Sequence, residues 1–258
     1  MDRSEKLLYL IKYLLSENTD YENIAVPESE EERFRLFRSL VNVRAPKPVS
    51  EDFLAVQDEF LKEKAAEKGV VDLKALTPIM PRIYLWQGDI TTLKCGAIVN
   101  AANSAMLGCF CPCHGCIDNA IHTFSGVQLR LECAEIMRKQ GFEEPVGRAK
   151  ITSAYDLPCD KIIHTVGPYV GGKLTESHCE QLISCYSECL KTAVRNGISS
   201  IAFCCISTGE FHFPNKKAAE IAVKTVSDFL RDNSDIEVIF NVFKNEDYAI
   251  YKRLLGGN

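Results

Sequence analysis

The sequence lacks any apolar run near the roughly 18 residues that a membrane-spanning helix needs. Its first residues, MDRSEKLLYLIKYLLSE, contain no small-residue cleavage site of the kind that follows a secretory leader. An excess of positive charge is also missing, since the formal net charge is −5. A mildly acidic chain is poorly suited to unspecific binding of nucleic acid or anionic membranes. We therefore expect a cytoplasmic protein that has neither nucleic acid nor a membrane as its partner.

Internal repeats of fixed period and low-complexity segments are absent from the 258 residues. A chain of this length suits one large α/β domain, or a medium-sized domain with an appendage. Apolar residues make up 46% of the chain, which is an ordinary share and sufficient for a sizeable buried core.

The N-terminal part of the chain has the periodicity of helices. Apolar residues over 7–15, 29–41 and 50–69 recur at the spacing of one helical face. None of these segments carries a residue cluster that suggests chemistry. We predict a helical N-terminal extension over residues 1–70, packed on the domain that follows.

From residue 71 to residue 258, short β-branched runs alternate with segments of helical period. Several of the runs are apolar almost throughout, as expected when helices cover both faces of a sheet. The pattern predicts a three-layer α/β/α domain with a central mixed, mostly parallel sheet. The expected strands lie at 83–90, 97–103, 149–157, 161–168, 199–208 and 237–243, and the expected helical segments at 116–141, 176–197, 215–232 and 246–255.

Polar or small residues follow four of the predicted strands. The sequence GDIT brings Asp89 after the first strand, NAAN brings Asn100 and Asn103 after the second, and VGP follows the fourth. The loop STGEFHFP then leads into a helix, and such a loop can hold an anion with its N–H groups. Because open α/β sheets bind ligands at the carboxyl ends of their strands, these residues together favour a nucleotide-like ligand.

Cysteine is abundant, with twelve residues, and in a long cytosolic chain metal binding or burial explains cysteine better than disulfides do. Four of the cysteines and a histidine occupy only eight positions, in CFCPCHGC at 109–116. The residues alone leave three interpretations open: a zinc site, a redox or iron–sulfur role, and reduced thiols without a ligand. For Cys185, Cys189, Cys204 and Cys205 we expect burial in the core.

The motifs GDIT, IVNAAN, IDNAIH, IIHTVGP and SIAFCCISTGEFHFP occur in this order over residues 75–245. In this combination the sequence resembles the macrodomain family, whose members bind ADP-ribose. The resemblance implies that Asp89 and Ile90 contact the adenine and that Asn100 and Asn103 lie near the distal ribose. It also implies a loop over the diphosphate, formed by Ser207, Thr208, Gly209, Glu210 and Phe211.

The sequence departs from the usual hydrolytic macrodomain where a glycine run should precede the IDNAIH helix. It resembles instead a zinc-containing subgroup with the pattern Cys-Phe-x-Pro-x-His-x-Cys and a helical N-terminal extension. The pattern assigns Cys109, His114 and Cys116 to one zinc ion per chain. Three protein ligands leave one position open for water or substrate, as in catalytic zinc sites. Cys111 and Cys113 fall at variable positions and should be dispensable.

The resemblance implies a zinc-dependent hydrolase that removes mono-ADP-ribose from modified protein side chains, with Asp or Glu as acceptor. Asn103 and Asp118 would be its catalytic residues. The implied partners are ADP-ribose, a mono-ADP-ribosylated lipoyl-carrier protein and a bacterial sirtuin-type ADP-ribosyltransferase. The alternative is a reader that binds ADP-ribose without cleaving it. We expect structural roles for His122 and His164 and assign none to His212.

Overall fold

The computed structural model describes residues 1–256 of the chain. Its N-terminal part consists of the helices α1 (Arg3–Ser16), α2 (Glu30–Val43) and α3 (Glu51–Lys68), with a short 3-10 turn η1 (Thr19–Tyr21) after the first. Side chains of Asp2, Ser29 and Ser50 cap the three helices by accepting a backbone N–H of the first turn. The helical extension predicted from periodicity is therefore present.

The rest of the chain builds a six-stranded sheet with the order β2-β8-β7-β4-β6-β5. All neighbours are parallel except β5, which runs antiparallel to β6. The predicted mixed, mostly parallel sheet is confirmed. Its strands are β2 (Ile83–Gln87), β4 (Ala97–Ala102), β5 (Ala149–Ser153), β6 (Lys161–Val166), β7 (Ser200–Phe203) and β8 (Glu237–Val242). A second, two-stranded sheet pairs β1 (Val71–Asp72) with β3 (Leu93–Lys94), and the 3-10 turns η2 (Leu73–Ala75) and η3 (Ile90–Thr92) lie next to it in sequence.

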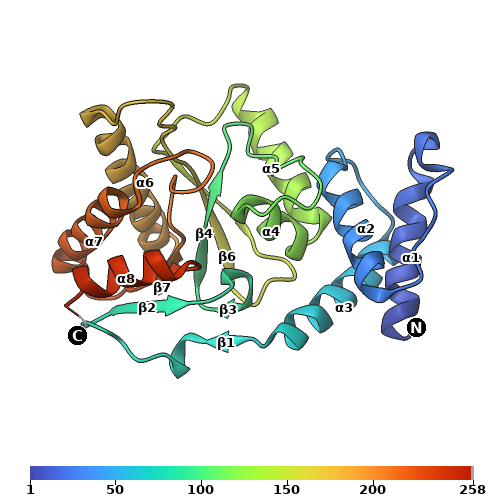
Figure 1. Ribbon diagram of the computed structural model, residues 1–258, viewed down its shortest axis with the longest axis horizontal. Helices are drawn as coiled ribbons and strands as arrows, with labels where there is room; N and C mark the ends of the chain where they lie inside the picture. Colours follow the sequence, from blue (N-terminus) through green and yellow to red (C-terminus); the bar gives the residue numbers. More distant parts are fainter. Residues whose placement is uncertain (257–258) are drawn as a thin grey trace.

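Helices cover both faces of the large sheet, which gives the three layers expected from the sequence (Figure 1). One face carries α6 (Glu176–Arg195), α7 (Asn215–Asp232) and α8 (Asn245–Leu254); the other carries α4 (Ile117–Phe124) and α5 (Val127–Gln140). The extension, blue to cyan in Figure 1, packs outside this second helical layer, with α2 against α4. None of the helices within residues 1–256 has the length and apolar content that a membrane crossing requires.

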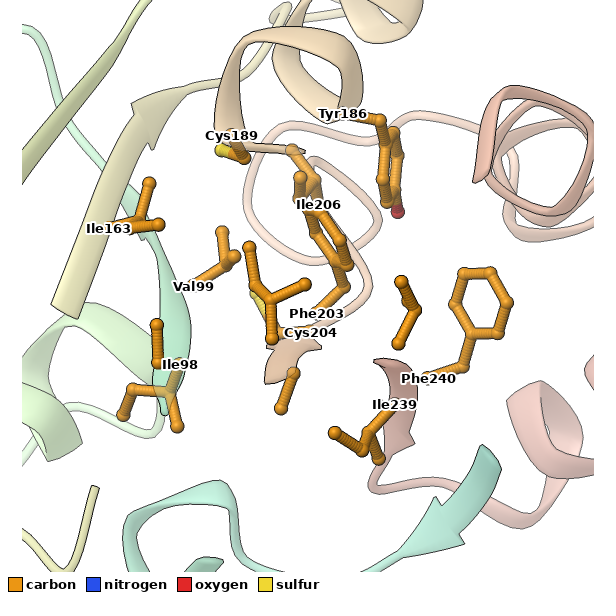
Figure 2. Packing of buried hydrophobic residues seen from close by; sticks show 14 of the residues in the cluster. Ile98, Val99, Ile163, Tyr186, Cys189, Phe203, Cys204, Ile206, Ile239 and Phe240 are labelled. Carbon is orange, nitrogen blue, oxygen red and sulfur yellow. The ribbon is translucent and has the colours of Figure 1, made fainter. Parts of the chain in front are cut away.

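Two hydrophobic clusters hold these layers together. The larger one lies between the sheet and its helices, and Figure 2 shows part of it, with Tyr186 and Cys189 of α6 above the strands β7 and β8. Cys185, Cys189 and Cys204 are buried there as expected, whereas Cys205 is only half-buried. The extension has a core of its own that reaches Phe124 and Val127 of the second layer.

The segment 116–141, predicted as continuously helical, is divided into α4 and α5. Ser125 ends α4, and Gly126 follows with a φ of 88°, a backbone conformation that favours glycine. A Cβ at Gly126 would approach the side-chain atoms of Gln57 and Gln128 to 2.5 Å. The break at Gly126 leaves room for Gln57 of α3. The apolar periodicity of residues 116–141 gives no sign of this tertiary contact.

Candidate functional site

Asn100 lies at the carboxyl end of β4 and connects two buried groups. Its Nδ2 group donates to Asp118 Oδ1 at 2.8 Å and contacts His164 Nδ1 at 3.1 Å. The other nitrogen of His164 lies 2.9 Å from the hydroxyl of Thr152. Because burial lowers the pKa of His164 to about 3, the ring is neutral and its Nδ1 accepts from Asn100. His164 is thus a hydrogen-bonded core histidine, as expected from the sequence.

Asp118 lies in the first turn of α4, where the helix dipole favours a carboxylate. The side chain is nearly completely buried, and burial raises its pKa to about 6 although the hydrogen bond from Asn100 lowers it. His122 Nε2 lies 3.6 Å from Asp118 Oδ1. Burial also lowers the pKa of His122 well below its ordinary value, so this pair is a carboxyl group next to a neutral imidazole rather than an ion pair.

Asn103 follows β4 by one residue and holds the start of the cysteine-rich loop. Its Nδ2 group donates to the carbonyl of Gly108 at 3.0 Å and lies 3.5 Å from Asp118 Oδ2. Within residues 1–256, the buried Oδ1 atoms of Asn103 and Asn100 have no hydrogen-bond partner. Buried amide oxygens are nearly always paired with a protein group or water, so these two atoms next to one carboxyl group can accept hydrogen bonds from a polar ligand or from water.

The three predicted metal ligands come together in the loop between β4 and α4. The ligand atoms of Cys109, His114 and Cys116 all lie within 4.8 Å of one another, and Cys109 Sγ is 3.7 Å from His114 Nδ1. Cys111 is exposed, and Cys113 turns toward α2 instead. Cys109 and Cys116 therefore lie in the cluster with His114, whereas Cys111 and Cys113 lie outside it.

This donor set fits zinc. Tetrahedral coordination at the usual zinc–sulfur and zinc–nitrogen lengths separates a thiolate from an imidazole nitrogen by about 3.5 Å, close to the distance between Cys109 and His114. Two thiolates and one imidazole leave a tetrahedral ion one further position. Cys109, His114 and Cys116 therefore form a cluster that could hold a metal ion.

The loop after β7 contains all five residues that were predicted to face a diphosphate. Ser207 has a φ of 64°, and its buried hydroxyl group has no hydrogen-bond partner within residues 1–256. A Cβ at Gly167 would come within 2.0 Å of that hydroxyl, so only glycine fits at this position of the VGP segment. Within the same part of the chain, the N–H groups of Gly209, Glu210 and Phe211 donate no hydrogen bond. Successive free N–H groups form an anion-binding concavity.

Glu210 and Phe211 connect this loop to its surroundings. The Oε1 atom of Glu210 lies 3.6 Å from Nε2 of His114, so the diphosphate loop and the metal loop meet at this histidine. Phe211 packs edge-on against Tyr169 with a centroid distance of 5.9 Å, and His212 also lies near Tyr169. His212 is exposed and makes no contact with the metal ligands in the part of the chain described.

At the other end of the sheet edge, Asp89 directly follows the β2 turn. Its Oδ1 atom accepts from the N–H and the hydroxyl of Thr91, at 3.0 Å and 2.6 Å. Burial opposes ionisation, but hydrogen bonds from Lys68 and Thr91 outweigh it and lower the pKa of Asp89. Ile90 is 2% exposed and belongs to the hydrophobic core, so any ligand contact of this residue would involve its main chain.

Several residues of this region escaped the sequence analysis. Phe243 follows β8, which pairs with β2, and its ring is 77% exposed next to the Asp89 turn. Lys68 and Arg38 contact site residues from distant parts of the chain, and Asn119, directly after Asp118, contacts the carbonyl of Cys111. An exposed aromatic residue after the last strand was a readable signal for Phe243. Lys68 and Arg38 are ordinary helix residues in sequence, and only the docking of the extension gives them their place. Asn119 belongs to the IDNAIH motif.

The chain is similar to known proteins at both sequence and structure level. Residues 99–222 match the family model described as Macro domain. A protein of Treponema medium named protein-ADP-ribose hydrolase is 52% identical over 99% of this chain and 100% of its own length. A Staphylococcus aureus protein of the same name is 52% identical over 96% of this chain and 94% of its own length.

Two solved structures extend the comparison. The Trypanosoma brucei macrodomain in complex with ADP-ribose has a TM-score of 0.65 and 30% identity, and it covers 89% of this chain and 97% of that chain. The Oceanobacillus iheyensis macrodomain with ADP has a TM-score of 0.63 and 38% identity, over 67% of this chain and 90% of that chain. With the sheet order and the site described above, these similarities establish that this chain belongs to the macrodomain family.

Proposed function

We propose that this protein is a zinc-dependent hydrolase that removes mono-ADP-ribose from modified protein side chains, with aspartate or glutamate as the acceptor. The observation that carries the proposal is that the ligand atoms of Cys109, His114 and Cys116 lie together. Two polar residues, Asn103 and Asp118, flank this cluster. Asn103 holds the residue before Cys109, and Asp118 comes two residues after Cys116. The similarity to relatives named protein-ADP-ribose hydrolase supports the same activity.

The ligand would lie along the carboxyl edge of the sheet, where such folds bind ligands. The adenine would donate to Asp89 and stack on the exposed ring of Phe243. The free N–H groups from Gly209 to Phe211 would bind the diphosphate. The distal ribose would then reach the unpartnered Oδ1 atoms of Asn100 and Asn103, whose pairing with ribose hydroxyls satisfies two buried acceptors.

Around the scissile bond, each residue has a distinct task. Cys109, His114 and Cys116 would hold one zinc ion, which supplies Lewis-acid chemistry at a ribose oxygen or at a water molecule. Glu210 Oε1 lies 3.6 Å from the outer nitrogen of His114 and would orient the ring, as carboxylates do for metal-bound histidines. Asn103 would orient the ribose, and the buried Asp118 would accept a hydrogen bond from a ribose hydroxyl or from the attacking water.

The expected substrate and setting remain those implied by the family resemblance. We propose a bacterial system in which a sirtuin-type ADP-ribosyltransferase modifies a lipoyl-carrier protein and this enzyme reverses the modification. A zinc site made of two cysteines requires reduced thiols, and all twelve cysteines of the chain are free in the structure. Both features suit the reducing cytoplasm that we propose as its compartment.

Metal analysis combined with turnover tests the proposal. The purified protein should contain about one zinc ion per chain and should release ADP-ribose from an auto-modified protein substrate. Chelator should abolish release, added zinc should restore it, and His114→Ala should lack both zinc and turnover. If the wild-type protein binds free ADP-ribose but leaves the label on the substrate in the presence of zinc, it is a reader and the hydrolase proposal is wrong. Full turnover by zinc-free His114→Ala would refute the role of the metal.

A further inference from the structure

The loop that carries the metal ligands has little structure of its own. Between β4 and α4, its internal backbone hydrogen bonds are those from Met106 to Asn103 and from His114 to Cys111, within the part of the chain that is described. Three ligands on such a segment would have to be ordered when a metal binds, and this ordering opposes binding. Support from outside the loop removes that opposition.

Arg38 of helix α2 supplies such support to two of the ligands. Its Nη2 group donates to the carbonyl of His114 at 2.8 Å and to Oδ1 of Asn119 at 2.7 Å, and its Nε group donates to the same Oδ1 at 3.1 Å. A planar guanidinium group with several donors is well suited to fix two acceptors at once. The backbone position of His114 is therefore set by a side chain of the extension, 76 residues away.

Asn119 transmits this contact to the other side of the loop. It is completely buried, its Nδ2 group donates to the carbonyl of Cys111 at 2.9 Å, and its N–H group lies 3.4 Å from Cys116 Sγ. Arg38 thus connects directly to His114 and, through Asn119, to Cys116 and to the turn that contains Cys111. Arg38 thus holds the side chain of the residue whose backbone N–H contacts Cys116.

Asn42, one helical turn after Arg38, holds the residue that precedes His114. Its Oδ1 atom accepts the N–H of Cys113 at 2.9 Å, and its Nδ2 group donates to Thr123 of α4 at 3.0 Å. Asn42 is buried, where a hydrogen bond is strong and its loss expensive. Together, the two α2 side chains contact the loop at Cys113 and His114 and helix α4 at Asn119 and Thr123.

We infer that Arg38 is a positioning residue of the metal site, and that helix α2 of the extension pre-orders the ligand loop for the ion. This inference rests on the proposed function, because it presumes that Cys109, His114 and Cys116 bind zinc. Substitution of a residue that hydrogen-bonds to metal ligands and orients them typically lowers metal affinity by about 10- to 100-fold. The extension would then be part of the metal centre rather than an appendage beside it.

The test compares Arg38→Met with wild type in the full-length protein. Zinc affinity is measured by competition with a chromophoric chelator, and ADP-ribose affinity is measured separately by calorimetry in excess chelator. We expect Arg38→Met to weaken zinc binding by at least about tenfold and to leave ADP-ribose affinity within about twofold, since the adenine and diphosphate contacts are elsewhere. A general loss of folding would weaken both. Arg35→Met is the matched control, because the Arg35 side chain is exposed on the same helix and should leave both affinities unchanged.

Arg38→Lys keeps the measurement informative if Arg38→Met does not fold. Lysine can reach one acceptor but lacks the fork that joins His114 to Asn119, so zinc affinity should be intermediate between wild type and Arg38→Met. Zinc affinity of Arg38→Lys equal to that of wild type would overturn the inference, as would equal affinity in Arg38→Met. If the wild-type protein binds no zinc, both the inference and the proposed function are wrong. If the wild type binds zinc and the Arg38 variants bind it equally well, only the inference is wrong.

Discussion

The ammonium group of Lys68 lies 2.5 Å from Oδ2 of Asp89, at the end of the sheet edge where an adenine is expected. The same group lies 3.6 Å from the ring centroid of Phe124 in α4. Lys68 is the last residue of α3, so both ends of the site are contacted by the extension: Asp89 by α3 and the metal loop by α2. Oδ1 of Asp89 already accepts two hydrogen bonds from Thr91, whereas Oδ2 accepts one from Lys68 and can accept a second from a ligand.

Lys68→Met should therefore weaken ADP-ribose binding without slowing the chemical step. The lysine holds the carboxylate in one orientation, and a binding contact that is the same in ground state and transition state changes KM rather than kcat. We expect KM and the calorimetric Kd for ADP-ribose to rise by roughly three- to tenfold, as for the loss of about 1 kcal/mol of a partly exposed ion pair, with kcat unchanged.

Two further variants isolate this effect. Lys64→Met removes a lysine one turn earlier, which pairs with Glu67 and does not contact Asp89, and it should behave as wild type. In the background of Asp89→Ala, the Lys68→Met substitution should have no additional effect on Kd, because the two residues act through one interaction. A fall in kcat of the same size as the rise in KM would contradict the binding role.

The sequence predicted those parts of the site that lie within one short segment. Cys109, His114 and Cys116 belong to a single loop, and Asn103 and Asp118 flank it, so their proximity in the chain was evident. Their selection from the other candidates in this loop rested on the resemblance to the zinc-containing macrodomain subgroup. The strand ends were equally predictable, because the carboxyl ends of parallel strands share one edge of a sheet. The fold class was also predictable, because alternating strand and helix periods are visible in the local sequence.

Contacts between distant segments could not be predicted in this way. Lys68 and Asp89 are 21 residues apart, and Arg38 and Asn119 are 81 residues apart. Amphipathic patterns of α2 and α3 indicate that one face is buried, but they do not indicate which surface of the domain receives it. The break between α4 and α5 at Gly126 was missed for this reason, since its cause is the packing of Gln57 from α3.

Gly108→Ala should destabilise the protein through the start of the metal loop. Gly108 has a φ of 82°, and a Cβ at this position would lie 2.7 Å from the ring of the buried His122. A left-handed backbone and a clash with a buried side chain together should lower the free energy of unfolding by roughly 2–4 kcal/mol. Urea unfolding monitored by circular dichroism provides the measurement.

Gly115→Ala is the matched control for this prediction. Gly115 lies in the same loop, between two metal ligands, but a Cβ there has nothing within 4 Å. Its substitution should change the free energy of unfolding by less than about 0.5 kcal/mol. Equal destabilisation by both alanines would show that the loop tolerates no substitution at all, and would remove the steric explanation for Gly108.

Removal of the two cysteines that lie outside the ligand cluster should leave the metal in place. Cys111 is exposed, and Cys113 contacts Ser39 and the Arg35 carbonyl of α2. Serine can make similar contacts at both positions, so Cys111→Ser and Cys113→Ser should keep about one zinc ion per chain, whereas Cys109→Ser should lose it. Zinc content measured by mass spectrometry after dialysis decides the matter, and loss of zinc from Cys111→Ser would mean that the ligand set is wrong.

Compared with Asp156→Asn, the wild-type protein should lose stability as the pH rises, because Asp156 is a buried carboxyl group between the extension and the domain. Burial, together with the nearby Asp58, raises the pKa of Asp156 from an ordinary 3.8 to about 7, although Lys62 lowers it. The folded state therefore binds the proton more tightly than the unfolded state, and the stability gained in this way is present below pH 4 and lost as the pH rises toward 7. Between pH 5 and pH 8, the wild type should lose roughly 2–3 kcal/mol of unfolding free energy more than Asp156→Asn, which cannot ionise.

Asp228→Asn is the control for this pH dependence. Hydrogen bonding to Lys224 lowers the pKa of Asp228, so this residue is ionised throughout the range and its substitution should leave the slope unchanged. Parallel pH profiles of wild type and Asp156→Asn in urea unfolding would show that Asp156 is ionised in the folded protein at pH 5.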